Sequence, residues 1–329
     1  MSTYLITGGA GFIGSNFIKY LFTNYKDIKI INIDKLTYAG NLKNLNWLNL
    51  NYNYTFIKED ICNRTSIHDI FDIYKPDYVI NFAAESHVDR SIQKLDSFLT
   101  TNILGTEVLM EASLKYKVKK FLQISTDEVY GSIETGYFTE DSTIKPNNPY
   151  AATKASADLL VQSYYNTHGI PALITRCTNN YGPRQHKEKL IPMIISNCLS
   201  SHSIPIYGDG KNIRDWIYVL DHCRAIDLVL NKGTLGEIYN ISGNNEISNI
   251  EIANLIIEKL NNLFPYKNID NSLIKYVEDR KGHDRRYGVS SEKIRTQLGW
   301  NPEYGFSNSL EKTINWYVKN SVSYKINSY

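Results

Sequence analysis

Short apolar runs alternate with longer amphipathic segments along the first half of the chain. The apolar runs are TYLITGG, IKIINID, YTFIKED, DYVINFAAE, KKFLQIST and IPALITRC. Near-continuous runs of this kind are typical of strands that are buried on both faces of a parallel sheet. Residues 12–22, 97–116 and 150–168 between them carry apolar side chains at helical spacing. The alternation predicts an α/β fold with a doubly wound parallel sheet.

The pattern changes after about residue 178, where the segments NNYGPRQ, YGDGKN and EDRKGHDRRYG are rich in glycine and polar residues. Residues 215–230 read as a further helix and GEIYNIS as a further strand, and both are expected to return to the first domain. We therefore predict a sheet domain of residues 1–178 plus about 215–242. A smaller, discontinuous substrate lobe would comprise about 179–214 plus 243–320.

Composition narrows the class of protein. The 329 residues are 42% hydrophobic, enough for a large core, and the net charge of +2 gives no preference for nucleic acid or membranes. Four cysteines without metal-binding spacing are typical of reduced thiols. The start of the chain does not resemble a signal peptide, and no apolar run is long enough for a membrane span. These features predict a cytoplasmic protein.

The segment TGGAGFIGS places Gly8, Gly11 and Gly14 between the first strand and the first helix. Such glycines permit a tight turn, close approach of a pyrophosphate and close packing of helix on strand. Asp34 ends the second strand and suits the hydroxyl groups of an adenosine ribose. This combination is typical of a Rossmann-type NAD site, although the neighbouring Lys35 weakens the preference for NAD over NADP. A glycine turn without a ligand is the alternative.

The segment PYAATK carries Tyr150 and Lys154 one helical turn apart, after a proline that suits the start of a helix. A lysine ammonium beside a tyrosine lowers the pKa of its hydroxyl group. The tyrosine could then take a proton from an alcohol while a hydride leaves to a nicotinamide. A solvated helix face is the alternative for such a pair on its own.

The segment STDEVYG places Asp127 and Glu128 after a buried strand. A random pair of acids is most often a solvated turn, but doubly wound sheets bind ligands at this end of their strands. Neighbouring side chains on a strand point to opposite faces. We therefore expect the strand to end at about Thr126, so that both acids reach one substrate.

Longer segments resemble the extended short-chain dehydrogenase/reductases and, more narrowly, the dTDP-glucose 4,6-dehydratases. The segments are TGGAGFIGSNF, DKLTYAGN, AAESHVDRSI, STDEVYG, NPYAATKA, NNYGPRQHKEKLIP, PIYGDGKNIRDWIYV and DRKGHDRRY. LTYAGN, TDEVYG and GHDRRY belong to this enzyme type rather than to the superfamily. Three positions depart from the pattern that is usual in this family. Lys281 stands in place of a proline, Leu220 in place of an acid and Thr178 in place of a serine.

The resemblance implies conversion of dTDP-glucose to dTDP-4-keto-6-deoxyglucose and water, with tightly bound NAD regenerated in each turnover. Tyr150 would deprotonate the 4-hydroxyl group of the sugar, with Lys154 beside it and Thr126 bonded to the 4-oxygen. Glu128 would then remove the carbon 5 proton. Asp127 would protonate the leaving 6-hydroxyl group.

The resemblance also implies two sets of contacts. Those to the cofactor are Gly8, Gly11, Phe12, Ile13, Gly14, Asp34, Lys35, Thr37, Asp60, Ile61, Ala84, Ser86, Thr101, Tyr150, Lys154 and Asn180. Those to the substrate are Ser86, Thr126, Asn179, Lys189, Leu190, Ile191, Pro205, Ile206, Tyr207, Arg214, Asn249, Arg280 and His283. His87 has no second ligand at metal spacing, so we expect no metal.

Several functions share these motifs. UDP-glucose 4,6-dehydratases also carry TDEVYG, and 4-epimerases and UDP-glucuronate decarboxylases share the glycine loop and the Tyr–Lys pair. Epimerisation eliminates nothing and needs neither acid, so Asp127 with Glu128 favours a dehydratase. A non-catalytic NAD-binding regulator would have lost some of these residues. The family also implies a homodimer in which two helices of each subunit form a four-helix bundle.

Overall fold

A parallel β-sheet forms the centre of the larger domain. The computed structural model describes residues 1–48 and 51–326. Within them, seven strands lie in the order β10-β6-β5-β4-β1-β2-β3, with every pair parallel. Their bounds are β1 (Ser2–Thr7), β2 (Ile28–Ile33), β3 (Tyr54–Ile57), β4 (Tyr78–Asn81), β5 (Lys120–Thr126), β6 (Ala172–Cys177) and β10 (Ile238–Ile241). The order reverses direction at β1, so the predicted doubly wound α/β sheet is confirmed.

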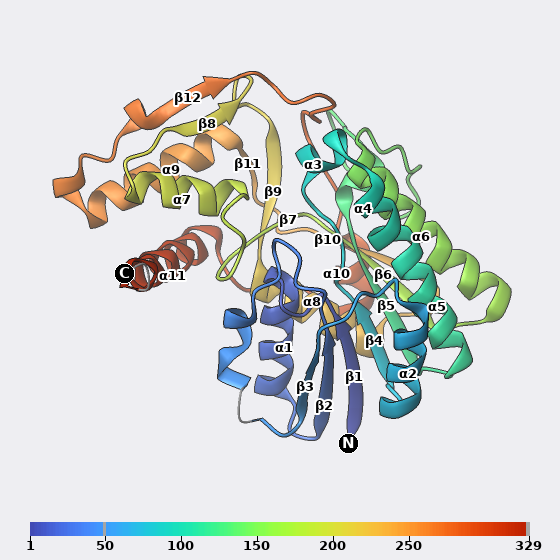
Figure 1. Cartoon of the computed structure of the whole chain (residues 1–329). Coiled ribbons are helices and arrows are strands. Elements are labelled where there is room, and N and C mark those ends of the chain that lie inside the picture. Colours follow the sequence, from blue (N-terminus) through green and yellow to red (C-terminus); the bar gives the residue numbers. More distant parts are fainter. Residues whose placement is uncertain (49–50, 327–329) are drawn as a thin grey trace.

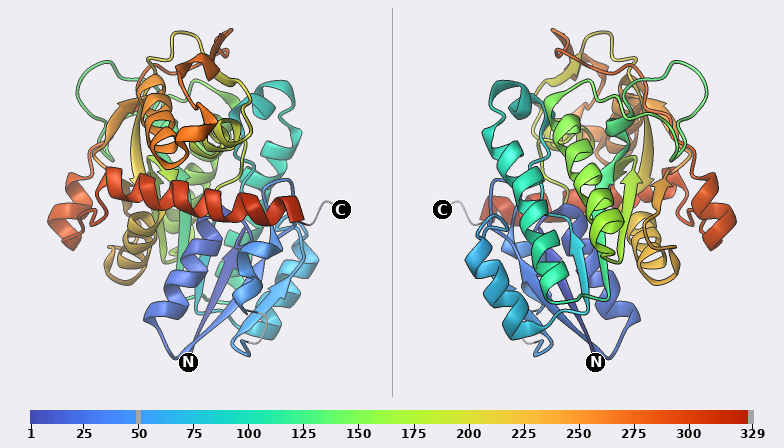
Figure 2. Two further views of the ribbon diagram at one scale, coloured as in Figure 1. Left: turned by 90° about the vertical axis from the view of Figure 1, so that its left-hand side faces the viewer. Right: turned by 90° about the vertical axis from the view of Figure 1, so that its right-hand side faces the viewer.

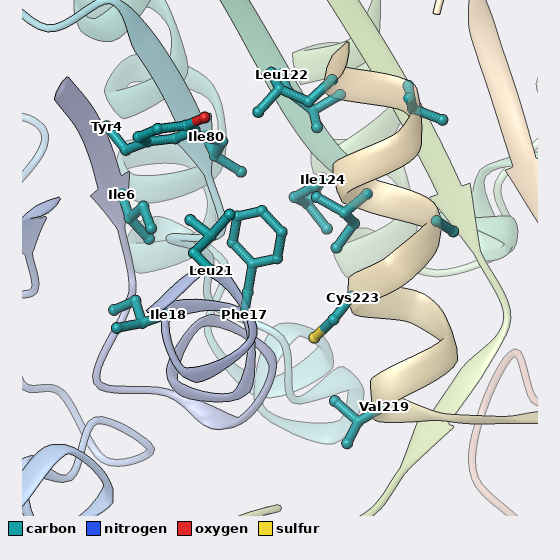
Figure 3. Packing of buried hydrophobic residues seen from close by; sticks show 14 of the residues in the cluster. Tyr4, Ile6, Phe17, Ile18, Leu21, Ile80, Leu122, Ile124, Val219 and Cys223 are labelled. Carbon is teal, nitrogen blue, oxygen red and sulfur yellow. The ribbon is translucent and has the colours of Figure 1, made fainter. Parts of the chain in front are cut away.

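Helices cover both faces of this sheet (Figure 1). One face packs against α1 (Phe12–Asn24), α8 (Val219–Lys232) and α10 (Glu292–Leu298), and the other against α2 (Arg64–Tyr74), α5 (Gly105–Lys115) and α6 (Pro149–His168). Figure 3 shows Phe17 and Leu21 of α1 gathered with Ile80 and Ile124 of the sheet and Cys223 of α8. Burial of these side chains fixes the sheet whose strand ends carry the site.

The predicted long helix at residues 97–116 contains a π-helical segment. It runs from α4 (Asp96–Phe98) through π-helical η2 (Leu99–Leu104) into α5. Asn102 in this segment is buried and donates hydrogen bonds to the Glu85 carbonyl at 3.1 Å and to Thr153 Oγ1 at 2.9 Å. π-Helical turns often occur at functional sites, and Thr101 lines the cleft described below.

The smaller lobe lies above the carboxyl ends of the main strands (Figure 1). It holds the sheet β11-β9-β7 and the parallel pair β12-β8, with bounds β7 (Asn179–Tyr181), β8 (Ile204–Tyr207), β9 (Ile213–Tyr218), β11 (Glu246–Ser248) and β12 (Ile274–Val277). Its helices are α7 (Leu190–Leu199), α9 (Asn249–Leu263) and α11 (Phe306–Ile326), packed around a core of their own. Short helical segments complete the fold: η1 (Leu42–Leu48), α3 (Val88–Gln93), η3 (Asp127–Tyr130), η4 (Pro265–Lys267) and η5 (Asn271–Leu273).

The helix predicted for residues 215–230 is wrong at its start. Asp215–Tyr218 belong to β9, which pairs with β7 and β11 rather than with the main sheet, and α8 begins at Val219. Aromatic and β-branched residues favour strands, and the run Trp216-Ile217-Tyr218 obeys that preference.

The predicted domain boundaries also need a change. Ile294 and Trp300 were assigned to the small lobe but pack into the core of the sheet domain. We propose that residues 213–218 belong to the small lobe and 292–300 to the sheet domain.

Candidate active site

A cleft opens at the carboxyl ends of the main strands, below the small lobe. All sixteen residues that were expected to contact the cofactor line it, together with Thr126, Asp127, Glu128, Asn179 and Lys189. These residues come from the segments after β1, β2, β3, β4, β5 and β6, from η2 and from α6. Convergence of so many strand ends on one cleft is the usual arrangement of a ligand site in a doubly wound sheet.

The glycine loop forms a backbone cradle at one wall of this cleft. Gly8 has a positive φ of 67°, and a Cβ atom there would lie 2.7 Å from the Ala83 nitrogen. A Cβ atom on Gly14 would lie 2.6 Å from the Gly8 oxygen. Gly11 is the N-cap of α1, whose first turn carries no acidic residue. The N-terminus of this helix therefore suits an anionic pyrophosphate, so the residues fit a dinucleotide.

Asp34 lies at the next strand end and is 9% exposed. Its Oδ2 accepts a hydrogen bond from the Ala10 amide at 2.9 Å and its Oδ1 from the Leu36 amide at 2.8 Å. Lys35 does not turn toward Asp34, because its Nζ pairs with Asp60 Oδ2 at 2.5 Å. The lysine that weakened the preference for NAD is thus held by another carboxylate.

The segment that carries the two acids turns sharply at its first residue. β5 ends at Thr126 as expected, and the 3₁₀ segment η3 begins at Asp127. Thr126 caps this segment, since its Oγ1 accepts a hydrogen bond from the Glu128 amide at 3.3 Å. The turn breaks the alternation of a strand, and both acids line the same cleft.

The two acids have different surroundings. Asp127 is 3% exposed, and burial raises the pKa of its carboxyl group well above 3.8, helped by the charges of Glu128 and Asp215. Its Oδ2 has no hydrogen-bond partner within the described residues. Glu128 Oε2, in contrast, accepts a hydrogen bond from Asn148 Nδ2 at 3.1 Å. The Tyr287 hydroxyl shares its proton between Glu128 Oε2 at 3.3 Å and Asp284 Oδ2 at 2.7 Å. Asp127 is therefore arranged to keep a proton, while donors hold the Glu128 carboxylate.

Tyr150 and Lys154 lie on the first turns of α6, which starts at Pro149. The expected lowering of the Tyr150 pKa by Lys154 is wrong for the protein alone. Burial raises that pKa well above 10.0, and the charges of Glu128 and Asp127 raise it further. The Lys154 ammonium donates to the Ile124 carbonyl at 2.7 Å, and burial lowers its pKa to about 8.

The expected substrate contacts divide into two groups. Ser86, Thr126, Asn179 and Lys189 line the cleft, whereas the rest lie beyond its lining: Leu190, Ile191, Pro205, Ile206, Tyr207, Arg214, Asn249, Arg280 and His283. Ile191 and Ile206 are buried in the core of the small lobe, so neither presents its side chain to a ligand.

Several of the outer residues form small clusters around aromatic rings and carboxylates. The Arg214 guanidinium lies 4.3 Å from the centre of the Tyr287 ring. The Tyr207 hydroxyl donates to Asp89 Oδ2 at 3.3 Å, and Arg280 lies 3.8 Å from the other oxygen of that carboxylate. These contacts hold Arg214 and Arg280 within the protein, and their role toward a substrate stays a prediction.

Three functional candidates were missing from the sequence-based prediction. Asn148 and Tyr287 hold Glu128, and Glu188 lies at the edge of the cleft beside His87 and Arg90, at 3.6 and 3.3 Å. Asn148 caps α6 through the Ala151 amide, so its position before a helix was a usable signal. Tyr287 lies 159 positions from Glu128 in the chain, and no local pattern could reveal their contact.

Two kinds of feature are absent from the part of the chain that the structure describes. No helix in residues 1–48 and 51–326 is both long and apolar enough to span a membrane. The same residues contain no cluster of three or more histidine, cysteine or acidic side chains that could hold a metal ion.

Comparison with known proteins adds independent findings. Residues 5–313 match the family model described as GDP-mannose 4,6 dehydratase. The chain is 48% identical over 314 residues to the low-salt glycan biosynthesis protein Agl12 of Haloferax volcanii, covering 95% of this chain and 98% of that protein. It is 46% identical over 332 residues to a dTDP-glucose 4,6-dehydratase of Xanthomonas campestris, covering 97% and 94%. The crystal structure of the dTDP-glucose 4,6-dehydratase DesIV of Streptomyces venezuelae, with NAD bound, superimposes with a TM-score of 0.92 at 42% identity, covering 98% of each chain.

Proposed function

The chain belongs to the dTDP-glucose 4,6-dehydratase family, and we propose that it converts dTDP-glucose to dTDP-4-keto-6-deoxyglucose and water with NAD as its cofactor. One observation carries the proposal. Asp127 and Glu128 share the cleft with Tyr150 but differ in burial and hydrogen bonding, as elimination by an acid and a base requires.

Oxidation at carbon 4 of the sugar comes first. Tyr150 takes the proton of the 4-hydroxyl group, and Thr126 donates a hydrogen bond to the same oxygen. Lys154 places a positive charge one helical turn from Tyr150. The glycine cradle and Asp34 would hold NAD, which would supply the hydride acceptor for carbon 4 and the hydride donor for carbon 6. A positive charge on its oxidised ring would favour ionisation of the tyrosine.

Elimination across carbons 5 and 6 follows. The new 4-ketone acidifies the proton on carbon 5, and the Glu128 carboxylate removes it. Asp127 donates its proton to the departing 6-hydroxyl group, which leaves as water. Burial raises the pKa of Asp127, which favours retention of that proton until the elimination. Glu128 afterwards returns a proton to carbon 5 when carbon 6 receives its hydride. The proton that Tyr150 took balances the one that Asp127 gave, and its transfer to Asp127 restores both groups for the next turnover.

The proposed cofactor site is the glycine cradle with Asp34, and the substrate extends from the acid pair toward Arg214 and Arg280. Guanidinium groups bind diphosphates well because they offer paired donors.

A UDP-glucose substrate is the alternative that differs least from this proposal, since the reacting sugar is the same. Epimerases and decarboxylases have no use for the Asp127 and Glu128 pair.

We further propose that the chain forms a homodimer through α5 and α6. Figure 2 shows these helices side by side on one face of the molecule. Leu99, Leu104 and Leu159 on this helical face are 43%, 43% and 55% exposed, which is unusual for so many leucines on adjoining helices. A partner that brings the same two helices would complete a four-helix bundle.

A cytoplasmic location of the protein remains a prediction.

The test is to offer dTDP-glucose and UDP-glucose separately to the purified protein and to weigh the products by mass spectrometry. We expect dTDP-glucose to lose one water, and UDP-glucose to react more slowly. A change of sugar configuration without loss of water would contradict the dehydratase function. Faster dehydration of UDP-glucose would retain that function and overturn the nucleotide assignment.

A further inference from the structure

A buried ion pair lies beside the catalytic residues. Asp158 on α6 and Arg176 on β6 have side chains that are 0% and 1% exposed, and Arg176 Nε donates to Asp158 Oδ2 at 2.9 Å. Neither residue takes part in the proposed reaction. Removal of two charges from water is costly, and a buried pair is weak evidence for stability alone. Its position therefore calls for another explanation.

Asp158 lies one helical turn beyond Lys154 on α6, and residues at this spacing share a helix face. Lys154 is 4% exposed and its ammonium donates to a neutral group, the Ile124 carbonyl, at 2.7 Å. A buried ammonium needs a nearby negative charge to stay protonated. Burial lowers the pKa of Lys154 to about 8, and the charge of Asp158 acts against that fall.

The other partner reaches the turn that carries the two acids. Arg176 Nη1 donates to the Tyr130 hydroxyl at 2.8 Å, and that hydroxyl donates to Asn240 Oδ1 at 2.9 Å. Tyr130 is 1% exposed and is the last residue of η3. The chain of contacts from Asp158 through Arg176 to Tyr130 therefore joins α6 to the turn with Asp127 and Glu128.

Other charged or titratable groups lie on α6 itself or on the elements that pack against it. Tyr150 lies on the same helix as Lys154, Arg176 on β6, and Asp127, Glu128 and Tyr130 on η3, while β5 supplies the Ile124 carbonyl. On α5, Glu107 pairs with Arg64. Burial raises the pKa of Asp127, of Tyr130 and also of Asp158, but Asp158 pairs directly with the Arg176 guanidinium, whose charge acts against that rise. Asp158 is thus the carboxylate placed to compensate Lys154 from the same helix.

We propose that Asp158 is a positioning residue that keeps the Lys154 ammonium charged, and that its ion pair with Arg176 fixes the acid-bearing turn η3 against α6. The inference rests on the proposed role of Lys154 in the reaction. The protonation of Lys154 can be measured without turnover, so a failure of this inference is distinguishable from a failure of the proposed function.

The test is a pH titration of Lys154 by NMR in the full chain labelled with ¹³C at lysine Cε. The Lys154 signal is the one that disappears in Lys154→Arg. Asp158→Asn keeps the size of the side chain and removes its charge. We expect the titration midpoint to fall by at least about one pH unit in this variant, and the basic limb of the kcat profile to move with it.

Two controls separate charge from packing. Asp158→Glu retains the charge and should keep a midpoint near that of the unaltered protein. Tyr130→Phe breaks the hydrogen bond to Arg176 without changing a charge, and its midpoint should not move. If Asp158→Asn does not fold, the double variant Asp158→Leu, Arg176→Met should still lower the midpoint, but by less, because loss of the Arg176 charge acts in the opposite direction. An unchanged Lys154 midpoint in the neutral variant would overturn the proposal.

Discussion

Replacement of Glu128 by glutamine separates the two halves of the proposed reaction. Glutamine has nearly the same shape, and its side-chain oxygen can still accept the hydrogen bonds that Asn148 and Tyr287 give to Glu128. The free energy of unfolding should therefore change by no more than about 0.5 kcal/mol. Glutamine cannot act as a base, however, and the carbon 5 proton then has no acceptor.

The size of the effect follows from the role of a general base. Such a group contributes about 10²- to 10⁴-fold to a rate, which corresponds to roughly 3–5 kcal/mol of activation free energy. Oxidation at carbon 4 depends on Tyr150 and should continue. The variant should therefore accumulate reduced cofactor with the 4-keto sugar still bound.

The assay has two readings in heavy water. Absorbance reports the reduced cofactor after substrate is added, and mass spectrometry reports deuterium that enters carbon 5. Glu128→Gln should form reduced cofactor but exchange the carbon 5 proton about 10²- to 10⁴-fold more slowly. Glu134→Gln, the same change at an exposed position, is the matched control and should behave as the unaltered protein. Exchange at the normal rate in Glu128→Gln would refute the role of this residue.

Three further predictions concern acid, cofactor and assembly. The folded protein raises the pKa of Asp127 above 3.8, so it binds that proton more tightly than the unfolded chain does. The stability that this gives is lost as the pH rises from 3.8 toward the pKa of the folded protein. Asp127→Asn removes this loss, so its melting temperature should rise relative to that of the unaltered protein between about pH 4 and about pH 8, and an equal difference at both pH values would contradict the assignment. Gly14→Ala places a Cβ atom 2.6 Å from the Gly8 oxygen. We expect calorimetry to show that the free energy of unfolding falls by about 1–3 kcal/mol and that NAD no longer binds. Gly305→Ala is the control, because a Cβ atom there meets no atom within 4 Å, and it should change neither property. Leu159→Asp should yield monomers in light scattering, while Leu263→Asp, at a leucine 45% exposed on the small lobe, should not; a persistent dimer in the first variant would place the interface elsewhere.

Much of the sheet domain was predictable because its signals are local. The strands are apolar throughout, since helices cover both faces, and β2 has five of its six residues buried. The glycine loop, Asp34 and the Tyr150–Lys154 spacing are likewise short patterns. The boundary between β9 and α8 was not predictable, because the run Trp216-Ile217-Tyr218 continues without a break into the apolar positions of α8.

The electrostatics of the site depended on contacts that no spacing reveals. Tyr287 and Glu128 meet across 159 positions, and Asp215 acts on Asp127 from a strand of the other lobe. The sequence predicted that Lys154 would lower the pKa of Tyr150. Burial and two neighbouring acids outweigh it in the protein alone, because desolvation disfavours a phenolate and like charges add to that cost.

The central claim is that the hydride removed from carbon 4 returns to carbon 6 of the same sugar after water has left. dTDP-glucose that carries deuterium on carbon 4 tests it directly, with the position of the label read by NMR in the product. The proposed reaction predicts deuterium in the new methyl group at carbon 6. Deuterium that stays on carbon 4, or that is lost to solvent, would contradict it.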